Sequence, residues 1–184
     1  MKIILTEADV SAGVTRLAQQ VTADHGDRPL TIIGIMTGSI VLLADLIRQL
    51  EMPLRVGVVQ TSSYRGETVR GELRINAELM PDIRQRDVLL IDDIFDTGHT
   101  LKQVIEVMRE LEPNSIRSAV LLRKQGRSEV AMMPDYVVFE IPDEFVVGYG
   151  LDYQDEYRNL PYVGSLEPDD LKVPSACDGL TENS

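Results

Sequence analysis

Short runs of apolar residues alternate along the chain with segments whose apolar positions recur every three or four residues. The first recurring segment, 6–21, presents its apolar side chains on one helical face and starts at Thr6, a residue type that caps helices. The apolar runs have the length and the β-branched content of strands that are buried on both faces. These expected strands are 30–35, 55–60, 88–91, 118–122, 136–140 and the short run 145–147.

Two further helical segments each follow one of these strands. One has apolar residues at positions 40, 43, 44 and 47. The other, whose apolar positions recur from Leu101 onward, is expected to begin at the Thr97–Gly98 turn and to stop before Pro113. Alternating strands and helices predict an α/β fold with a mostly parallel central sheet flanked by helices. In such sheets, ligands bind where the strands end and the helices begin. The polar residues of those turns are therefore the first candidates for a functional site.

Two stretches depart from this alternation. Residues 61–81 are polar and carry only a weak strand pattern at 72–75, which indicates a hairpin or a flexible lid. After Leu166, the chain has few apolar residues and no period. We expect one folded domain over residues 1–166 and a flexible C-terminal tail over residues 167–184.

Composition narrows the class of protein. A chain of 184 residues is the size of one domain, and its net charge of −12 argues against a broad nucleic-acid surface, which would show a basic face. The one cysteine, Cys177, excludes a disulfide within the chain and suits a reducing compartment. No apolar run approaches the length of a membrane span. We expect a cytoplasmic protein that binds neither nucleic acid nor membrane.

The most distinctive polar segment, DDIFDTGHT, follows the strand expected at 88–91. Adjacent Asp92 and Asp93 precede a third carboxylate, Asp96, and a turn in which Gly98 lets the backbone approach a phosphate. The N–H groups at the start of the following helix suit the same anion. The adjacent carboxylates would repel a phosphate, whereas vicinal ribose hydroxyls or Mg²⁺ would satisfy them. A phosphorylated pentose fits both halves of the segment.

Residues 88–100 resemble the phosphoribosyl pyrophosphate (PRPP) motif of type I phosphoribosyltransferases. Aspartate at position 96 is typical of the branch that uses 6-oxopurines, where other branches tend to carry alanine. The resemblance continues through 35–39, 63–64, 122–124 and 141–153. Over residues 1–166, the chain is therefore similar to the hypoxanthine-guanine phosphoribosyltransferase family. This resemblance implies the type I phosphoribosyltransferase fold, with a small hood and a flexible lid loop.

The resemblance also implies an activity. Members of the family convert hypoxanthine or guanine and PRPP to IMP or GMP and pyrophosphate in purine salvage, with Mg²⁺ as cofactor. Such enzymes are commonly homodimers or homotetramers. Two alternatives remain: a PRPP-binding regulatory protein without catalysis, and a phosphoribosyltransferase that prefers xanthine or another base.

The family's roles fall on specific residues of this motif. Asp96 is implied as the catalytic proton acceptor, although an aspartate there would also suit a helix cap. Asp92 and Asp93 are implied to hold the ribose hydroxyls. The implied 5′-phosphate loop consists of Thr97, Gly98, His99 and Thr100.

A second anion site is implied at the end of the first parallel strand. Met36, Thr37 and Gly38 would bind pyrophosphate through backbone N–H groups, with Arg158 as a further contact. The family often carries a basic residue where Thr37 stands, and it tends to hold the Met36–Thr37 peptide in cis. Asp152 is the implied Mg²⁺ ligand.

The remaining implied residues concern the base and the lid. Lys124 would donate a hydrogen bond to the 6-oxo group and so select oxo over amino purines, although a lysine at a strand end is commonly solvated. Phe145 would stack on the purine, and the backbone of Val146 would bind its edge. Ser63 and Tyr64 would fold over PRPP and exclude water.

Overall fold

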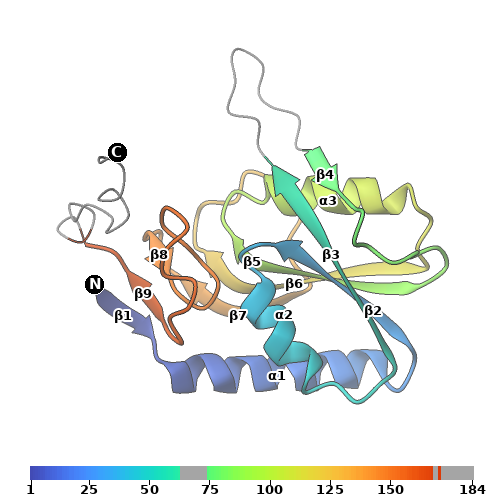
Figure 1. Ribbon diagram of the computed structural model, residues 1–184, viewed down its shortest axis with the longest axis horizontal. Coiled ribbons are helices and arrows are strands. Elements are labelled where there is room, and N and C mark those ends of the chain that lie inside the picture. Colours follow the sequence, from blue (N-terminus) through green and yellow to red (C-terminus); the bar gives the residue numbers. More distant parts are fainter. Residues whose placement is uncertain (63–73, 168–169, 171–184) are drawn as a thin grey trace, which may run out of the picture.

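A six-stranded sheet forms the centre of the computed structural model, which describes residues 1–62, 74–167 and 170 (Figure 1). The strand order is β4-β3-β2-β5-β6-β7. Its strands are β2 (Leu30–Met36), β3 (Leu54–Ser62), β4 (Arg74–Asn76), β5 (Asp87–Phe95), β6 (Ser115–Lys124) and β7 (Tyr136–Ile141). Strands β3, β2, β5, β6 and β7 run parallel, and β4 pairs antiparallel with β3. The predicted α/β fold with a mostly parallel sheet is confirmed.

Helices cover both faces of this sheet. The helices α1 (Glu7–His25) and α2 (Ile40–Ile47) lie on one side, and α3 (His99–Arg109) lies on the other (Figure 1). Alternate residues of β5 serve the two faces, because Leu89 and Ile91 belong to the apolar cluster of α1 and α2, whereas Val88 and Leu90 belong to that of α3. Burial on both faces explains why residues 88–91 of this strand form an unbroken apolar run.

Helix α1 begins where the sequence predicts and runs further. The Thr6 hydroxyl accepts a hydrogen bond from the Asp9 N–H, and the Asp9 carboxylate accepts one from the Thr6 N–H, which forms a capping box. The helix continues past residue 21 to His25 and ends at Gly26, whose φ is 67°. None of the helices in the described ranges is long and apolar enough to cross a membrane.

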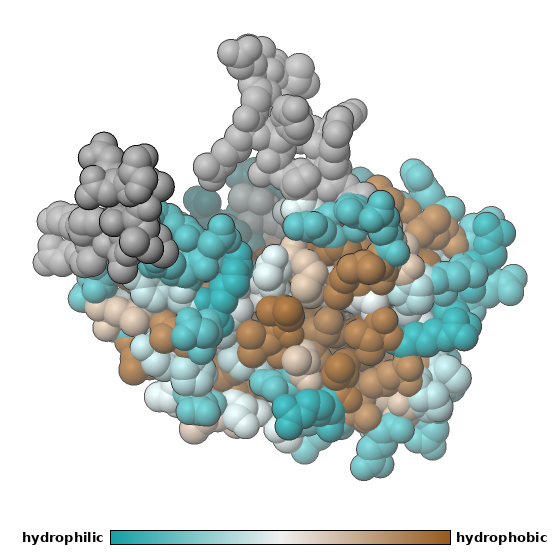
Figure 2. Space-filling view, viewed as in Figure 1, coloured by the Kyte–Doolittle hydropathy of each residue, from teal (hydrophilic) through white to brown (hydrophobic). Residues whose placement is uncertain are grey.

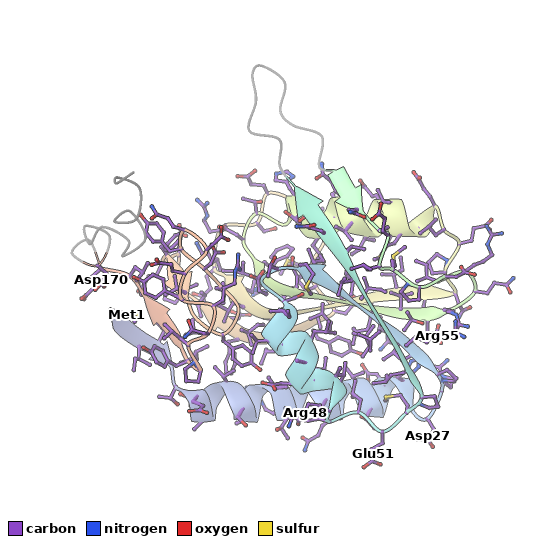
Figure 3. The ribbon with its side chains drawn as sticks, in the orientation of Figure 1. Met1, Asp27, Arg48, Glu51, Arg55 and Asp170 are labelled. Carbon is purple, nitrogen blue, oxygen red and sulfur yellow. The ribbon has the colours of Figure 1, made fainter. Side chains whose placement is uncertain are left out.

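A second, three-stranded antiparallel sheet forms a hood beside the first (Figure 1). Its strands, in order, are β1 (Lys2–Leu5), β9 (Val163–Ser165) and β8 (Val146–Val147). The resemblance implies a hood, and β8 lies within the run predicted at 145–147, but the sequence patterns miss β1 and β9. These strands are too short to show a period of their own. Near them, the ammonium group of Met1 lies 2.6 Å from the Asp170 carboxylate (Figure 3).

Several element boundaries differ from the prediction. Strand β5 does not end at residue 91 but continues to Phe95, because residues 92, 94 and 95 still pair with β6. Strand β6 likewise continues to Lys124. Helix α3 ends at Arg109, and Leu111 is exposed beyond it. The hairpin predicted in 61–81 is present at its base as the β3–β4 pair, whereas 63–73 and nearly all of the predicted tail lie outside the described residues.

Candidate active site

Two adjoining cavities open at the carboxyl edge of the main sheet. The larger, the main cleft, has a volume of about 320 Å³. Of the predicted site residues, it is lined by Met36, Thr37, Gly38, Asp92, Asp93, Asp96, Thr97, Gly98, Thr100, Asp152 and Arg158. The smaller, the side cavity, has a volume of about 200 Å³. It shares Asp93, Asp96 and Asp152 with the main cleft and adds Lys124, Phe145 and Val146.

The turn between β5 and α3 forms one wall of the main cleft. Gly98 lies in the left-handed region at φ 86°, and a Cβ atom there would lie 2.5 Å from a Val130 methyl carbon, so the turn requires glycine. Gly98 offers no side-chain cap to α3, which leaves the first N–H groups of the helix available to an anion. Thr97 and Thr100, which each carry a hydroxyl, line the main cleft in the same turn. This turn can therefore hold a phosphate.

His99 belongs to this turn but does not line either cavity. Its side chain is exposed, and its Nε2 atom lies 2.8 Å from a carboxylate oxygen of Glu129. The ring therefore points away from the main cleft. What His99 can offer a ligand is its backbone N–H at the start of α3.

Asp92 and Asp93 lie near the carboxyl end of β5. Asp92 is buried, and Asp93 is half-buried. An Asp92 oxygen accepts the Asp93 N–H at 3.1 Å, and an Asp93 oxygen accepts the Ile94 N–H at 2.8 Å. Burial and then the neighbouring Asp93 charge raise the pKa of Asp92 well above its usual range, and burial also raises the pKa of Asp93. Ligand hydroxyls would supply donors to these carboxylates.

The turn after β2 also lines the main cleft and packs directly against Asp93. The Met36–Thr37 peptide is cis, as the family resemblance implies. A Cβ atom at Gly38 would overlap the Asp93 carboxylate, so glycine is needed for the two turns to approach each other. Because Thr37 carries no charge, an anion bound here would rely on backbone N–H groups.

The segment after the hood strand β8 closes over the same turn. Gly150, at φ 100°, packs so closely on the Gly38 carbonyl that a Cβ atom would overlap it. The Tyr149 hydroxyl donates to the Asp45 carboxylate on α2 at 2.6 Å. Burial, followed by this hydrogen bond, raises the pKa of Tyr149. These contacts tie the hood side of the site to the main sheet.

Arg158 and Asp152 come from this closing segment. An Arg158 nitrogen lies 2.8 Å from an Asp152 oxygen, and another donates to the Gly150 carbonyl at 2.7 Å. No group of three or more His, Cys, Asp or Glu side chains converges on a metal site within the ranges that the structure describes. Mg²⁺ that is bound mainly by phosphate oxygens needs only one or two carboxylates, so Asp152, which borders both cavities, suits it.

The side cavity combines a cation, an aromatic ring and a strand backbone. Lys124 is the last residue of β6, and its ammonium nitrogen lies 3.4 Å from an Asp96 oxygen. The Phe145 side chain is 51 % exposed and contacts Tyr153 edge-on, with 5.7 Å between ring centroids. Val146 lies beside it at the start of β8. An exposed aromatic face at a cavity is suited to stacking on a planar ligand.

Sequence reasoning missed two charged residues that contact the residues of this cavity. The Nε atom of Arg127 donates to an Asp96 oxygen at 3.0 Å, and Asp143 lies 3.4 Å from the Lys124 ammonium. Asp143 belongs to a segment that resembles the family but has no assigned role there, and no pattern marks Arg127. The predicted lid residues Ser63 and Tyr64 lie outside the described residues.

Comparisons with known proteins agree with this architecture. The family described as "Phosphoribosyl transferase domain" matches residues 2–154. The hypoxanthine-guanine phosphoribosyltransferase of Staphylococcus aureus (strain Mu50) is 41% identical over 169 residues, which are 91% of this chain and 94% of that protein.

Two solved structures are similar over nearly the whole chain. A hypoxanthine phosphoribosyltransferase from Staphylococcus aureus gives a TM-score of 0.87 at 40% identity, with 95% of each chain covered. A hypoxanthine-guanine phosphoribosyltransferase from Bacillus anthracis gives a TM-score of 0.86 at 32% identity, with 91% of this chain and 99% of that chain covered. Sequence identity, coverage and fold agree, and the chain belongs to the phosphoribosyl transferase family and, within it, to the hypoxanthine-guanine phosphoribosyltransferases.

Proposed function

We propose that this chain serves purine salvage by transferring the phosphoribosyl group of PRPP to hypoxanthine or guanine, with IMP or GMP and pyrophosphate as products. The observation that carries the proposal is the position of Asp96, which lines both the main cleft and the side cavity. A proton acceptor at this junction would lie between a sugar phosphate in the main cleft and a base in the side cavity.

In this proposal, PRPP occupies the main cleft. Its 5′-phosphate accepts hydrogen bonds from the N–H groups and hydroxyls of the turn before α3. Its ribose hydroxyls donate hydrogen bonds to Asp92 and Asp93. Its pyrophosphate takes the backbone N–H groups of Thr37 and Gly38, with Arg158 as the nearby positive charge. The contacts between the two turns and the hood segment support this arrangement, because they hold both anion sites at fixed separation.

The base occupies the side cavity, stacked on Phe145 with its edge on the Val146 backbone. Lys124 donates to the 6-oxo oxygen, which favours oxopurines over aminopurines. A ring nitrogen of the base attacks the anomeric carbon as the bond to pyrophosphate breaks, and the proton of that ring passes to Asp96. The sugar carries positive charge during this step, as in glycoside hydrolysis.

Asp152 is the residue that would hold Mg²⁺, together with oxygen atoms of pyrophosphate. When bound, the ion neutralises charge on the departing group. The Arg158 guanidinium, 2.8 Å from Asp152, would keep that carboxylate oriented toward the main cleft.

A spectrophotometric assay with PRPP, Mg²⁺ and one base at a time tests the proposal. We expect turnover with hypoxanthine and guanine, and weak or no turnover with adenine. Asp96→Asn should lower turnover by about 10²- to 10⁴-fold while PRPP binding is largely kept. Loss of turnover with every base, with PRPP still bound, would favour a regulatory protein. A preference for xanthine, or equal activity with adenine, would contradict the substrate or the role of Lys124.

We also propose that the chain acts in the cytoplasm as a homodimer or homotetramer. Exposed apolar side chains support an assembly: Ile40 on α2 and Val56 on β3 are 47 % and 45 % exposed. A brown patch extends over these two elements in Figure 2. Sedimentation at several protein concentrations would measure the oligomeric state.

A further inference from the structure

Four charged side chains form a closed ring at the edge of the side cavity. The Lys124 ammonium lies 3.4 Å from Asp96 and 3.4 Å from Asp143. The Arg127 Nε atom lies 3.0 Å from the other Asp96 oxygen and 3.7 Å from the other Asp143 oxygen. Each cation therefore lies between the same two carboxylates, and the four charges sum to zero.

The two cations of the ring differ in position and in contact. Lys124 lines the side cavity, and its side chain is 11 % exposed, whereas Arg127 lies in the turn after β6 and is 45 % exposed. Arg127 makes a hydrogen bond to Asp96, while the Lys124 contact is an ion pair at longer distance. Arg127 is absent from the lining of both cavities. Arg127 can therefore orient the Asp96 carboxylate without occupying the space that a ligand would take.

The proposed reaction changes what Lys124 can do. A base that accepts a hydrogen bond from the Lys124 ammonium takes that donor at least partly away from Asp96 and Asp143. Both carboxylates would then lose a counter-charge in a partly desolvated site, which costs free energy unless another cation remains. Arg127 contacts the same two carboxylates and does not need to move when the base binds.

We propose that Arg127 is a positioning residue for base transfer. It fixes the Asp96 carboxylate through its Nε–H and serves as the counter-charge of Asp96 and Asp143 when a 6-oxopurine engages Lys124. Without Arg127, the base would compete with two carboxylates for one ammonium, and Asp96 would lose the hydrogen bond that orients it. This inference rests on the proposed function and adds a residue outside the substrate cavities to it.

The test compares Arg127→Ala and Arg127→Lys with the matched variant Arg123→Ala. Arg123 lies beside Lys124 on β6 and pairs with Glu140, so its removal costs a similar ion pair away from Asp96. For Arg127→Ala, we expect kcat to fall and the KM for hypoxanthine to rise, each by about fivefold to tenfold, since one charged hydrogen bond is lost. The KM for PRPP should stay within about twofold of wild type. Arg123→Ala should behave as wild type.

Two further measurements separate positioning from a structural role. Added guanidinium, at constant ionic strength, should restore part of the kcat of Arg127→Ala, because the site is exposed enough to admit it. Arg127→Lys should keep part of the activity, since a cation remains. Unchanged kcat and KM for hypoxanthine in Arg127→Ala would overturn the proposal, as would equal losses in Arg123→Ala. If wild-type protein turned over no base at all, the proposed function itself would fail first.

Discussion

At the scale of residues, three aspartates of one motif differ because of their surroundings. Asp92 is 7 % exposed, and its pKa is raised by burial and by the adjacent Asp93 charge. Asp96 lies beyond the strand and is paired with Arg127 and Lys124. The sequence marks all three as acidic residues in a turn. Their separate environments depend on β6 and its following turn, which approach only in the folded chain.

A first prediction concerns Asp92 and folding stability. A carboxyl whose pKa is higher in the folded than in the unfolded chain binds more protons when folded, so it lowers stability as the pH rises above the ordinary value of 3.8. Asp92→Asn should therefore raise the free energy of unfolding at neutral pH, on the order of 1 kcal/mol. The gain in stability should vanish below about pH 4, where the wild-type carboxyl is also uncharged. The same substitution should raise the KM for PRPP, since Asp92 is proposed to hold a ribose hydroxyl. Urea denaturation at several pH values measures the stability.

Asp87→Asn is expected to change folding stability in the opposite direction to Asp92→Asn. Hydrogen bonding, chiefly from Ser115, lowers the pKa of Asp87 in the folded chain. The charged form is therefore favoured on folding, and its contribution is lost as the pH falls through that lowered pKa. The amide should lower stability at neutral pH. A stabilising effect at position 87, or a destabilising one at 92, would contradict this account.

At the scale of elements, the strength of the local signal decides how well the sequence predicts each one. The central strands and the helices α1, α2 and α3 are predicted because their apolar patterns extend over whole turns or runs. The ends of β5 and β6 are not predicted correctly, because each strand continues to pair with its neighbours beyond its apolar run, into polar residues. Strands β1 and β9 exist through their mutual pairing, which no local pattern shows.

A second prediction concerns the start of α1. Thr6→Ala removes the hydroxyl that caps the Asp9 N–H and breaks the capping box. We expect Tm to fall by about 2–4 °C, because one orphan N–H loses its partner. Thr15→Ala, within the same helix, should leave Tm unchanged or slightly higher, since alanine favours helix interiors. Both variants should keep the activity of wild type. Calorimetry would measure Tm, and the base assay would measure the activity.

At the scale of the whole molecule, the candidate site forms where the hood meets the main sheet. The main sheet contributes the turns after β2 and β5 and the end of β6, while the hood side contributes Phe145, Val146, Asp152 and Arg158. Contact between the Gly38 and Gly150 backbones joins the two sides. The geometry of the turn after β2 therefore depends on how firmly the hood is held.

A third prediction tests this coupling through Tyr149. Tyr149→Phe removes the hydrogen bond from the hood segment to Asp45 on α2 and should cost about 1 kcal/mol of stability. We also expect the KM for PRPP to rise more than the KM for hypoxanthine, because the Gly150–Gly38 contact loosens.

Tyr136→Phe serves as the control for Tyr149→Phe. The Tyr136 hydroxyl is also largely buried and donates to Asp24 at 2.8 Å, but it belongs to β7 and lines neither cavity. A similar loss of stability with an unchanged KM for PRPP is expected there. Equal KM values in the two variants would show that the Tyr149 contact does not couple the hood to the site.

The family, the order of the main elements and most of the residues that line the two cavities can be predicted from the amino-acid sequence alone. This is possible because a phosphate turn, a buried strand and an amphipathic helix are each encoded by residues close together in the chain. The closed ring of Asp96, Lys124, Asp143 and Arg127, the raised pKa of Asp92 and the strand pairing that builds the hood are visible only in the folded chain. These features arise from residues that are distant in sequence, and their energies depend on burial and charge at short range, which only folding creates.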